Sequence, residues 1–443
     1  MFKTLRNAWK ISELRSKILF TLLIIALYRI GTAIPVPFIA YDALLSTGAA
    51  NMFTTGVFGY LDILSGGALS SPALFALSVT PYINAQIIIQ LLTVAIPVLE
   101  RWAKDGDAGR KKIDKLTRYL TVALSIITSI GYYAILKNLG VISASDVHWF
   151  FKAATIVTVF TAGGSVVMWL GEKIDEQGIG NGISMILFAN IVAALPDNII
   201  QYVRGLAANT EVAVWLKWIL GVGTLLIIVA SLVFVIYMTD AERRIPVQYA
   251  KRVVGRKMYG GQSSNLPIKL NMSGVMPVIF ASTIVSVVPT ILAIVESARG
   301  KQFAEKSFWG VVESLFAPTS ALYIVLLFVL IIAFAYFYIS ISFNPVEVSN
   351  NLMQQGGFIP GIRPGKPTAQ YITKVLNKVI LMGALFLSVV ACVPHILNAV
   401  SGGLLGLIAF SGTTLLIVVG VILETFRELE AQMTMRHYKG FLD

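Results

Sequence analysis

Ten stretches of apolar residues constrain the fold of this chain more than any other feature, because each is long enough to cross a lipid bilayer. A transmembrane helix needs about 20 apolar residues to cross roughly 30 Å of hydrocarbon. With 56% hydrophobic residues and a mean hydropathy of +0.77, the composition excludes an ordinary soluble protein. The predicted spans lie at about 18–36, 73–96, 118–136, 153–170, 183–203, 214–238, 271–295, 319–341, 375–396 and 404–424.

The charges between these spans predict how the chain crosses the membrane. If the N-terminus is cytoplasmic, 27 lysines and arginines fall in cytoplasmic segments and 7 fall outside, while Arg29 lies within the first span. Cytoplasmic loops carry an excess of Lys and Arg, so this asymmetry predicts that both termini are cytoplasmic. It also accounts for much of the net charge of +12 without nucleic acid. We expect Arg29 to face protein or to extend toward the interface, and assign it no transport role.

The stretch from Phe58 to Ile96 reads as a broken membrane segment. Its first part, 59–69, is too short to span and contains Asp62 and the run Ser65-Gly66-Gly67. Lipid cannot satisfy exposed backbone groups, so a short piece at membrane depth must be enclosed by protein or line a water-filled cavity. The residues leave two interpretations open, which are a re-entrant element and an external loop before an ordinary span.

Ten spans divide into two sets of five, and the second set would enter from the opposite side of the membrane. This topology predicts an inverted pair of halves, 1–204 and 205–443, although no residue-level repeat is evident. The second half contains two long cytoplasmic loops, 239–270 and 342–373.

The link between spans four and five, 171–184, has glycines at 178, 180 and 182. This spacing permits a tight turn between helices. A nucleotide-binding loop is disfavoured because no strand precedes the link and the lysine-plus-hydroxyl ending is missing. A compact turn explains the glycines, but it leaves the acidity of the link unexplained.

The string EKIDEQGIGNGIS in this link strongly resembles the signature of the SecY/Sec61-alpha family, the central channel subunits of the Sec protein translocase. Further motifs agree in order along nearly the whole chain: SGGALSSPALFAL with TPYINAQIIIQLLT, GRKKIDKLTRY, RRIPVQYAKR, LPIKLNMSGVMPVIFAS, FNPVEVSNNLMQQGGFIPGIRPGKPT and LLIVVGVILE. The resemblance implies an all-α polytopic membrane protein, with ten transmembrane helices in two inverted five-helix halves around a central pore that holds a re-entrant plug.

The resemblance also implies a plug and an apolar pore ring. A narrow aliphatic collar excludes ions by dewetting and can spread around a passing chain. Val79 and Ile83 are four residues apart, and so are Ile183 and Leu187, so each pair lies on one helix face. The plug, within 58–70, would include Tyr60, Leu61, Asp62, Ile63, Leu64, Ser65, Gly66 and Gly67, and the ring would consist of Val79, Ile83, Ile183, Leu187, Ile279 and Ile417.

The family's lateral gate lies between spans two and three on one side and seven and eight on the other, where Asn84 would border it. In span seven, Pro277 and Pro289 would remove backbone donors and permit bending.

The two long cytoplasmic loops would contact the SecA motor or a ribosome. Pro-Gly pairs on both sides of Arg363 preset turns and predict a rigid tip. The alternative for these cations is topogenic charge with lipid-headgroup contact. The residues that the resemblance assigns to partner contact are Arg243, Arg244, Lys251, Arg252, Arg256 and Arg363.

The function that this resemblance implies is a channel for unfolded secretory polypeptides, which also releases membrane segments sideways into lipid. The expected partners are SecE, SecG, SecA, a translating ribosome with its RNA, signal peptides, nascent polypeptides and membrane lipids. The expected location is the bacterial plasma membrane.

No cofactor, metal or enzymatic activity is expected. The histidines His148, His395 and His437 are far apart, no HExxH pair exists, and Cys392 is solitary. The main alternative function is a secondary transporter with inverted repeats, which would need a convergent polar site near the membrane midplane.

Overall fold

The computed structural model describes most of the chain. The described residues are 2–40, 65, 67–143, 147–208, 214–249, 252–254, 257–259, 263–299, 307–317, 320–400 and 406–439.

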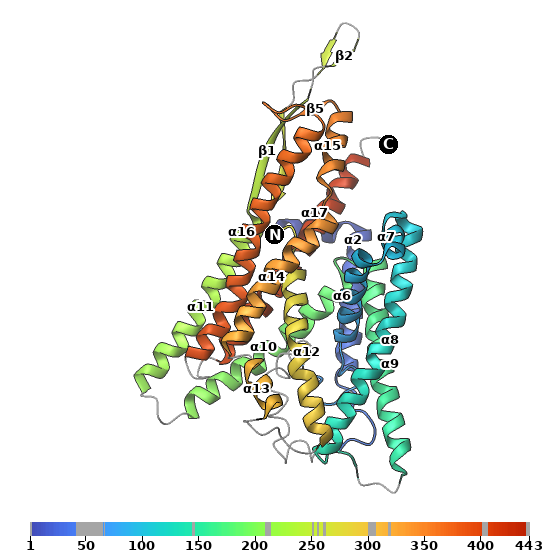
Figure 1. The fold of residues 1–443 in the computed structure, drawn as a ribbon, viewed down its shortest axis with the longest axis vertical. Helices are drawn as coiled ribbons and strands as arrows, with labels where there is room; N and C mark the ends of the chain where they lie inside the picture. Colours follow the sequence, from blue (N-terminus) through green and yellow to red (C-terminus); the bar gives the residue numbers. More distant parts are fainter. Residues whose placement is uncertain are drawn as a thin grey trace. The chain divides into compact units, whose positions relative to one another are not determined.

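Helices dominate the described residues (Figure 1). They are α1 (Phe2–Lys10), α2 (Ser12–Gly31), α6 (Thr80–Ala95), α7 (Pro97–Lys104), α8 (Gly106–Asn138), α9 (Trp149–Gln177), α10 (Gly182–Ala208), α11 (Val214–Asp240), α12 (Met276–Arg299), α13 (Phe308–Leu315), α14 (Ala321–Ser342), α15 (Pro345–Gln354), α16 (Lys366–Val400) and α17 (Gly406–Lys439). The strands are β1 (Glu242–Tyr249), β2 (Arg252–Val254), β3 (Lys257–Tyr259), β4 (Ser263–Lys269) and β5 (Gly357–Phe358).

The predicted polytopic helical fold is confirmed, since each predicted span overlaps a helix. Within the described part of the chain, six helices are long and apolar enough to cross a membrane: α8, α9, α10, α11, α14 and α16. The pair α6 and α7 adds a seventh if it is counted as one span. Helices α2, α12 and α17 cover the remaining predicted spans, so the structure is consistent with ten crossings.

The chain forms two compact units. One comprises Met1–Thr210, Val285–Ser320 and Gly420–Asp443, and the other comprises Glu211–Ile284 and Ala321–Val419. We call them the first and second unit and describe each separately. The inverted halves predicted from the span count remain a prediction.

In the first unit, α8 and α9 run side by side in opposite directions (Figure 1), and α6 packs against α8. The Ser129 hydroxyl of α8 lies 3.2 Å from the Thr161 hydroxyl of α9. Close to this contact, α9 approaches the segment before α6 so tightly that a Cβ on Gly163 would lie 1.9 Å from the Leu74 carbonyl oxygen. Small residues therefore allow the backbones to meet, as in other membrane helix pairs.

One end of the first unit collects α1, the α9–α10 link and the C-terminal part of α17. Ala8, Leu14, Ile179 and Leu429 form a buried apolar cluster there. The N-terminal helix and the end of α17 thus lie at the same end of this unit. An even number of membrane crossings requires that arrangement.

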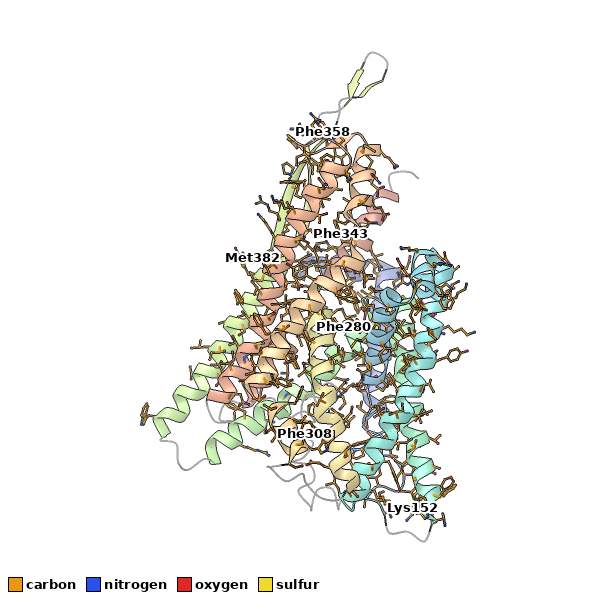
Figure 2. The ribbon with its side chains drawn as sticks, in the orientation of Figure 1. Lys152, Phe280, Phe308, Phe343, Phe358 and Met382 are labelled. Carbon is orange, nitrogen blue, oxygen red and sulfur yellow. The ribbon has the colours of Figure 1, made fainter. Side chains whose placement is uncertain are left out.

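The opposite end of the first unit joins the segments that follow α2 and α8. The Val141 carbonyl accepts a 2.8 Å hydrogen bond from the Ala40 amide, and the Phe38 carbonyl accepts one of 2.9 Å from the Ser143 amide. Lys152 of α9, which is labelled in Figure 2, donates to the Ser143 carbonyl at 2.9 Å. These contacts place the two links at the same end, as the predicted topology requires.

In the second unit, α14 packs along α16, and α11 contacts α16. Phe280 of α12, which is labelled in Figure 2, packs edge-on against Phe334 of α14, with ring centroids 5.9 Å apart.

A small sheet, absent from the all-helical prediction, joins the two long loops of the second unit. Its strand order is β4-β1-β5, with antiparallel pairing that sets Ile245 opposite Leu266. Along β1, buried Ile245 and Val247 alternate with exposed neighbours, as expected of a strand with one covered face. The covered face packs on side chains of α14 and α16.

Helix α6 begins later than predicted, at Thr80 instead of about Ala73, and residues 67–79 form turns. This segment pairs with the chain after α2: Pro35 and Ala73 form a β-bridge, and the Leu74 amide donates to the Ile34 carbonyl at 2.9 Å. Those external hydrogen bonds replace the helical ones. Pro81 then occupies the first turn of α6, where its missing N–H costs nothing.

Candidate functional site

The segment that leads into α6 contains the described end of the predicted plug. Tyr60, Leu61, Asp62, Ile63, Leu64 and Gly66 lie outside the described residues. The Ser65 hydroxyl accepts a 3.1 Å hydrogen bond from the Leu69 amide, and the Leu69 carbonyl accepts one from the Tyr132 hydroxyl of α8. Gly67, with φ of +85°, adopts a conformation that favours glycine. The plug sequence therefore ends in a left-handed turn followed by a fixed anchor at Leu69.

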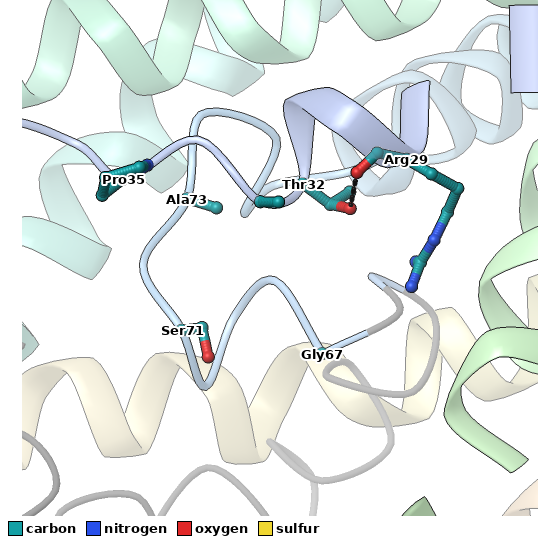
Figure 3. Close-up of a pocket in the computed structure, with 7 residues that line it drawn as sticks. Arg29, Thr32, Pro35, Gly67, Ser71 and Ala73 are labelled. Atoms are coloured by element: carbon teal, nitrogen blue, oxygen red, sulfur yellow. Dashed lines mark hydrogen bonds between the residues drawn. The ribbon is translucent and has the colours of Figure 1, made fainter. Parts of the chain in front are cut away.

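A cavity of about 510 Å³ lies beside this anchor (Figure 3). The Arg29 side chain is half-buried and lines it, and the Thr32 hydroxyl donates to the Arg29 carbonyl at 2.8 Å. The arginine of span one thus faces a cavity inside the first unit. The lining residues are Arg29, Thr32, Ala33, Pro35, Gly67, Ser71 and Ala73.

Four predicted ring residues belong to the first unit, and all are buried. Val79 directly precedes α6 and is 1% exposed, while Ile83, one turn later, is 5% exposed. The Ile83 amide donates to the Val79 carbonyl at 3.0 Å, so the two side chains lie on one face of the helix. Ile183 and Leu187 lie in the first two turns of α10 and are 8% and 1% exposed.

The other two predicted ring residues belong to the second unit. Ile279 lies in the first turn of α12 and Ile417 lies within α17, and both are buried. All six side chains are therefore aliphatic and buried. Their assignment to one ring remains a prediction.

The predicted lateral gate involves α6 and α12, and in α12 one of two prolines lies where it was not expected to act. Asn84 is half-buried in α6. Pro289 lies inside α12, where it can permit bending. Pro277 instead lies at the second residue of α12, where no intrahelical hydrogen bond is lost. The proposed bending effect of Pro277 is therefore wrong.

The glycine link between α9 and α10 is held by side chains that accept hydrogen bonds from its backbone. Asp175 accepts from the Gly182 amide at 2.7 Å, and Glu428 of α17 accepts from the Gly180 amide at 2.9 Å. Thr21 of α2 accepts from the Ile179 amide at 3.0 Å. The Asp175 carboxylate satisfies the first amide of α10 and complements its dipole. The other two acids of the link form ion pairs, Glu172 with Arg118 and Glu176 with Lys173.

Sequence reasoning missed Thr21 and Glu428 as partners of this link. Glu428 is 248 residues from Gly180, and Thr21 is 158 residues from Ile179. No local pattern marks either residue. The nearest signal in the sequence was the unexplained acidity at 172–176, a stretch that includes Asp175.

Replacing Gly182 by Ala should destabilise the first unit. A Cβ there would lie 2.0 Å from the Gly171 carbonyl oxygen, a backbone atom that cannot rotate away. Forced overpacking of this kind typically costs about 1–3 kcal/mol. Thermal unfolding in detergent should show a lower midpoint. Gly223→Ala is the control, because a Cβ at Gly223 meets no atom within 4 Å. Equal midpoints for both variants would contradict the close packing.

Three of the predicted contact residues of the first long loop, Arg243, Arg244 and Arg252, lie on its strands. Arg243 and Arg244 on β1 are exposed, and Arg244 forms a 2.6 Å ion pair with Glu242. Arg252 lies on β2, while Lys251 and Arg256 lie outside the described residues. Exposed arginines on an antiparallel strand are available to an acidic or phosphate-bearing partner.

Arg363 lies exposed in a tight turn of the second long loop. Gly361 and Gly365 on either side have φ of +81° and +94°. The Thr368 hydroxyl donates to the Arg363 carbonyl at 2.8 Å, and the Ser349 hydroxyl donates to the Gly365 carbonyl at 2.8 Å. The structure therefore fixes the backbone of this turn and leaves the guanidinium side chain at its surface.

Side chains suited to metal binding are not clustered in the described residues: no group of three His, Cys, Asp or Glu could hold an ion there. His148 accepts a hydrogen bond from the Phe150 amide at the start of α9, and the His395 ring packs against Tyr323 at 5.5 Å. These two histidines therefore have structural partners.

Comparison with known proteins gives matches over the whole chain. The sequence model of the SecY family matches residues 73–426. The protein translocase subunit SecY of Streptomyces galbus is 43% identical over 449 residues, covering 100% of both chains. That of Corynebacterium glutamicum is 42% identical, covering 98% of this chain and 99% of that one.

Solved structures share the fold at low sequence identity. One is a SecY protein whose plug domain is described as stabilising the closed state of the translocation channel and maintaining a membrane seal. It has a TM-score of 0.63 and 14% identity over 95% of this chain and 92% of that one. Sec61 from a canine ribosome–channel complex has a TM-score of 0.58 at 14% identity, with the same coverage. On its full-length sequence match and its fold, the chain belongs to the SecY family.

Proposed function

We propose that this chain is the central subunit of a protein-conducting channel that passes unfolded secretory polypeptides across the plasma membrane. The full-length match to protein translocase subunits supports this function. The observation that carries it is the interrupted second span. Residues 68–78 follow the plug sequence in turns, are anchored to α8 at Leu69, and lead directly to buried Val79, which we assign to the ring.

The proposed ring would form the closed barrier. It would consist of the aliphatic side chains of Val79, Ile83, Ile183, Leu187, Ile279 and Ile417 around the pore axis. A ring of aliphatic side chains offers ions no ligands, so water and ions are excluded when it is closed. A solute carrier would instead need a convergent polar or ionisable site. The aliphatic character of all six residues favours the channel.

The polypeptide would leave sideways through a gate that Asn84 of α6 borders, next to α8 on one side and α12 and α14 on the other. Pro289 within α12 supports this role, because a proline inside a helix removes a backbone hydrogen bond and lowers the cost of bending.

Partners would supply the energy, so the chain itself would act as a channel without enzymatic activity. We propose SecA and a translating ribosome at the cytoplasmic loops, with SecE and SecG beside the bundle. The solved structure of Sec61 in a ribosome–channel complex supports the ribosome as a partner. The exposed Arg243, Arg244 and Arg363 support a contact with carboxylates or phosphates, including ribosomal RNA.

Both termini would face the cytoplasm. The excess of cations in the predicted inner segments supports this orientation. Two observations in the first unit are consistent with it. Arg118 of the basic α7–α8 region forms a 2.7 Å ion pair with Glu172, next to the α9–α10 link. The same link packs with α1 and α17.

Deleting residues 60–64 tests the channel function. The deletion removes most of the proposed plug while keeping Leu69, which is anchored to Tyr132 of α8, and Ser65, which accepts from the Leu69 amide. Ion conductance of vesicles containing the complex should rise strongly, because a seal is lost while the folded bundle is kept. A solute carrier would show no such conductance.

The control is a chain lacking residues 440–443, which should conduct as little as the parent. Folding of each variant is checked by its recovery from the membrane and its elution from a sizing column. Unchanged conductance in a folded 60–64 deletion would contradict the proposed plug and weaken the channel assignment.

A further inference from the structure

Three buried polar side chains meet at the entry to α6, and they come from three different parts of the first unit. Tyr28 of α2 and Ser78 have their hydroxyl oxygens 3.1 Å apart. The Asn190 amide of α10 donates to the Tyr28 hydroxyl at 2.8 Å and to the Ser78 hydroxyl at 3.2 Å. Tyr28 and Asn190 are 0% exposed and Ser78 is 1% exposed, so the three groups form a closed, solvent-excluded triangle.

The backbone at Ser78 is strained. Its φ is +50°, in the left-handed region that residues with a Cβ rarely adopt. Strained positions of this kind persist only where the surrounding structure determines them, and they gather at functional sites. Here the determining contacts are those to Tyr28 and Asn190, together with the 2.9 Å hydrogen bond from the Ser78 amide to the Phe75 carbonyl.

Aromatic packing fixes the Tyr28 ring beside this triangle. The ring stacks on Phe75 with centroids 5.5 Å apart and planes 7° apart. Gly31 leaves room for Phe75, since a Cβ there would lie 1.9 Å from the Phe75 ring. The Tyr28 hydroxyl is therefore held in place by its ring as well as by its hydrogen bonds.

The position of Ser78 links the triangle to the proposed pore. Ser78 directly precedes Val79, whose carbonyl accepts the hydrogen bond from Ile83 that begins the helical ladder. Residues 69–78 are thus fixed at both ends, by Tyr132 at Leu69 and by the triangle at Ser78. Displacement of Ser78 would move Val79 and change the direction in which α6 begins.

We propose that Tyr28, Ser78 and Asn190 act as a latch that positions Val79 and Ile83 in the closed channel. The inference rests on the proposed pore role of these two ring residues. The latch links α2, the start of α6, and α10. Its buried polar groups can give up their hydrogen bonds to one another at low cost only if water enters and replaces those bonds. Opening of the pore beside Val79 would therefore release the latch.

The accessibility of a cysteine at Val79 tests the latch without any transport measurement. The background is Cys392→Ala, which removes the native thiol. Val79→Cys is labelled with a membrane-impermeant maleimide in vesicles containing the full chain in its complex. Adding Asn190→Leu, which keeps the side-chain size and removes both amide hydrogen bonds, should speed labelling about five- to tenfold, the shift expected from losing a buried hydrogen bond. Tyr28→Phe should act in the same direction but more weakly.

Two controls separate positioning from general loosening. Leu136→Cys reports on the fully buried core of α8, and it should stay unlabelled in every latch variant. Tyr336→Phe removes a tyrosine hydroxyl that donates to the Asn377 carbonyl at 3.2 Å in the second unit, and it should leave labelling at Val79 unchanged.

The backbone strain at Ser78 allows an independent test that compares two substitutions at that position. Ser78→Ala removes the hydroxyl and keeps the cost of a positive φ, whereas Ser78→Gly removes both. Labelling at Val79 should therefore be faster in Ser78→Ala than in Ser78→Gly. The reverse order would count against the latch.

Labelling that becomes faster at Val79→Cys in the latch variants, while Leu136→Cys stays unlabelled, supports the latch. Labelling that is unchanged in Asn190→Leu overturns it, and so does labelling that rises equally at Val79 and Leu136, because the triangle then serves only general folding. Unchanged labelling in Asn190→Leu together with raised conductance in the 60–64 deletion would reject the latch and keep the channel. Faster labelling in Asn190→Leu together with unchanged conductance in the 60–64 deletion would reject the proposed plug and keep the latch geometry.

Discussion

Replacing Ile83 by Asn should make the closed channel leak ions and should improve the export of proteins that carry defective signal sequences. Ile83 is 5% exposed on the face of α6 that also presents Val79. An unpaired amide in an apolar environment costs about 1–3 kcal/mol in proteins, so it favours states in which water reaches it. In a pore ring, that water opens a path for ions, and the energy gap between the closed and open states shrinks.

Ile89→Asn is the matched control, since Ile89 lies on the same helix and is 4% exposed. Both variants should lower the yield of folded protein, because both bury an amide. Only Ile83→Asn should raise conductance in reconstituted bilayers. Ile417→Asn should behave like Ile83→Asn if both line one ring. Equal leakage from Ile83→Asn and Ile89→Asn would show that the effect follows burial, and the ring assignment would fall.

Arg363→Glu should abolish most motor-driven translocation while leaving membrane insertion and assembly intact. The Arg363 side chain is exposed, and the contacts that fix its turn use the backbone carbonyls of Arg363 and Gly365. Glu keeps those contacts and reverses the charge presented to a partner. Arg363→Lys should give an intermediate rate, because lysine keeps the charge but cannot form the two parallel hydrogen bonds of a guanidinium.

The measurement is import of a preprotein into vesicles with purified SecA and ATP, with SecE recovery measured in parallel. Lys366→Glu serves as the control, because Lys366 is also exposed and lies three residues away. A rate equal to that of the parent would remove Arg363 from the motor contact. Loss of SecE recovery would show instead that Arg363 supports folding.

The sequence alone determined where the membrane helices lie, because a span depends on the local supply of apolar residues. The run at 319–341, for example, predicted α14 (Ala321–Ser342) within a few residues. The Pro-Gly pairs around Arg363 likewise predicted a fixed turn, since proline and glycine restrict or permit backbone angles within a few residues. Long motifs in family order also sufficed to identify the family and to nominate the ring.

The tertiary structure decided what depends on distant partners. Residues 73–79 are apolar enough for a helix, yet pairing with the chain after α2 holds them in turns and delays α6 to Thr80. The sheet of β1, β4 and β5 needs the two long loops to meet and the helices α14 and α16 to cover it. Hydropathy alone gives no sign of either contact.

The same holds for the polar contacts. Asn190 lies 162 residues from Tyr28 and 112 from Ser78, and Glu428 lies 248 residues from Gly180. A single Asn or Ser within an apolar span shows only that a buried polar group needs a partner. Which partner satisfies it depends on how the helices pack, because a hydrogen bond forms only when two groups come within about 3 Å of each other.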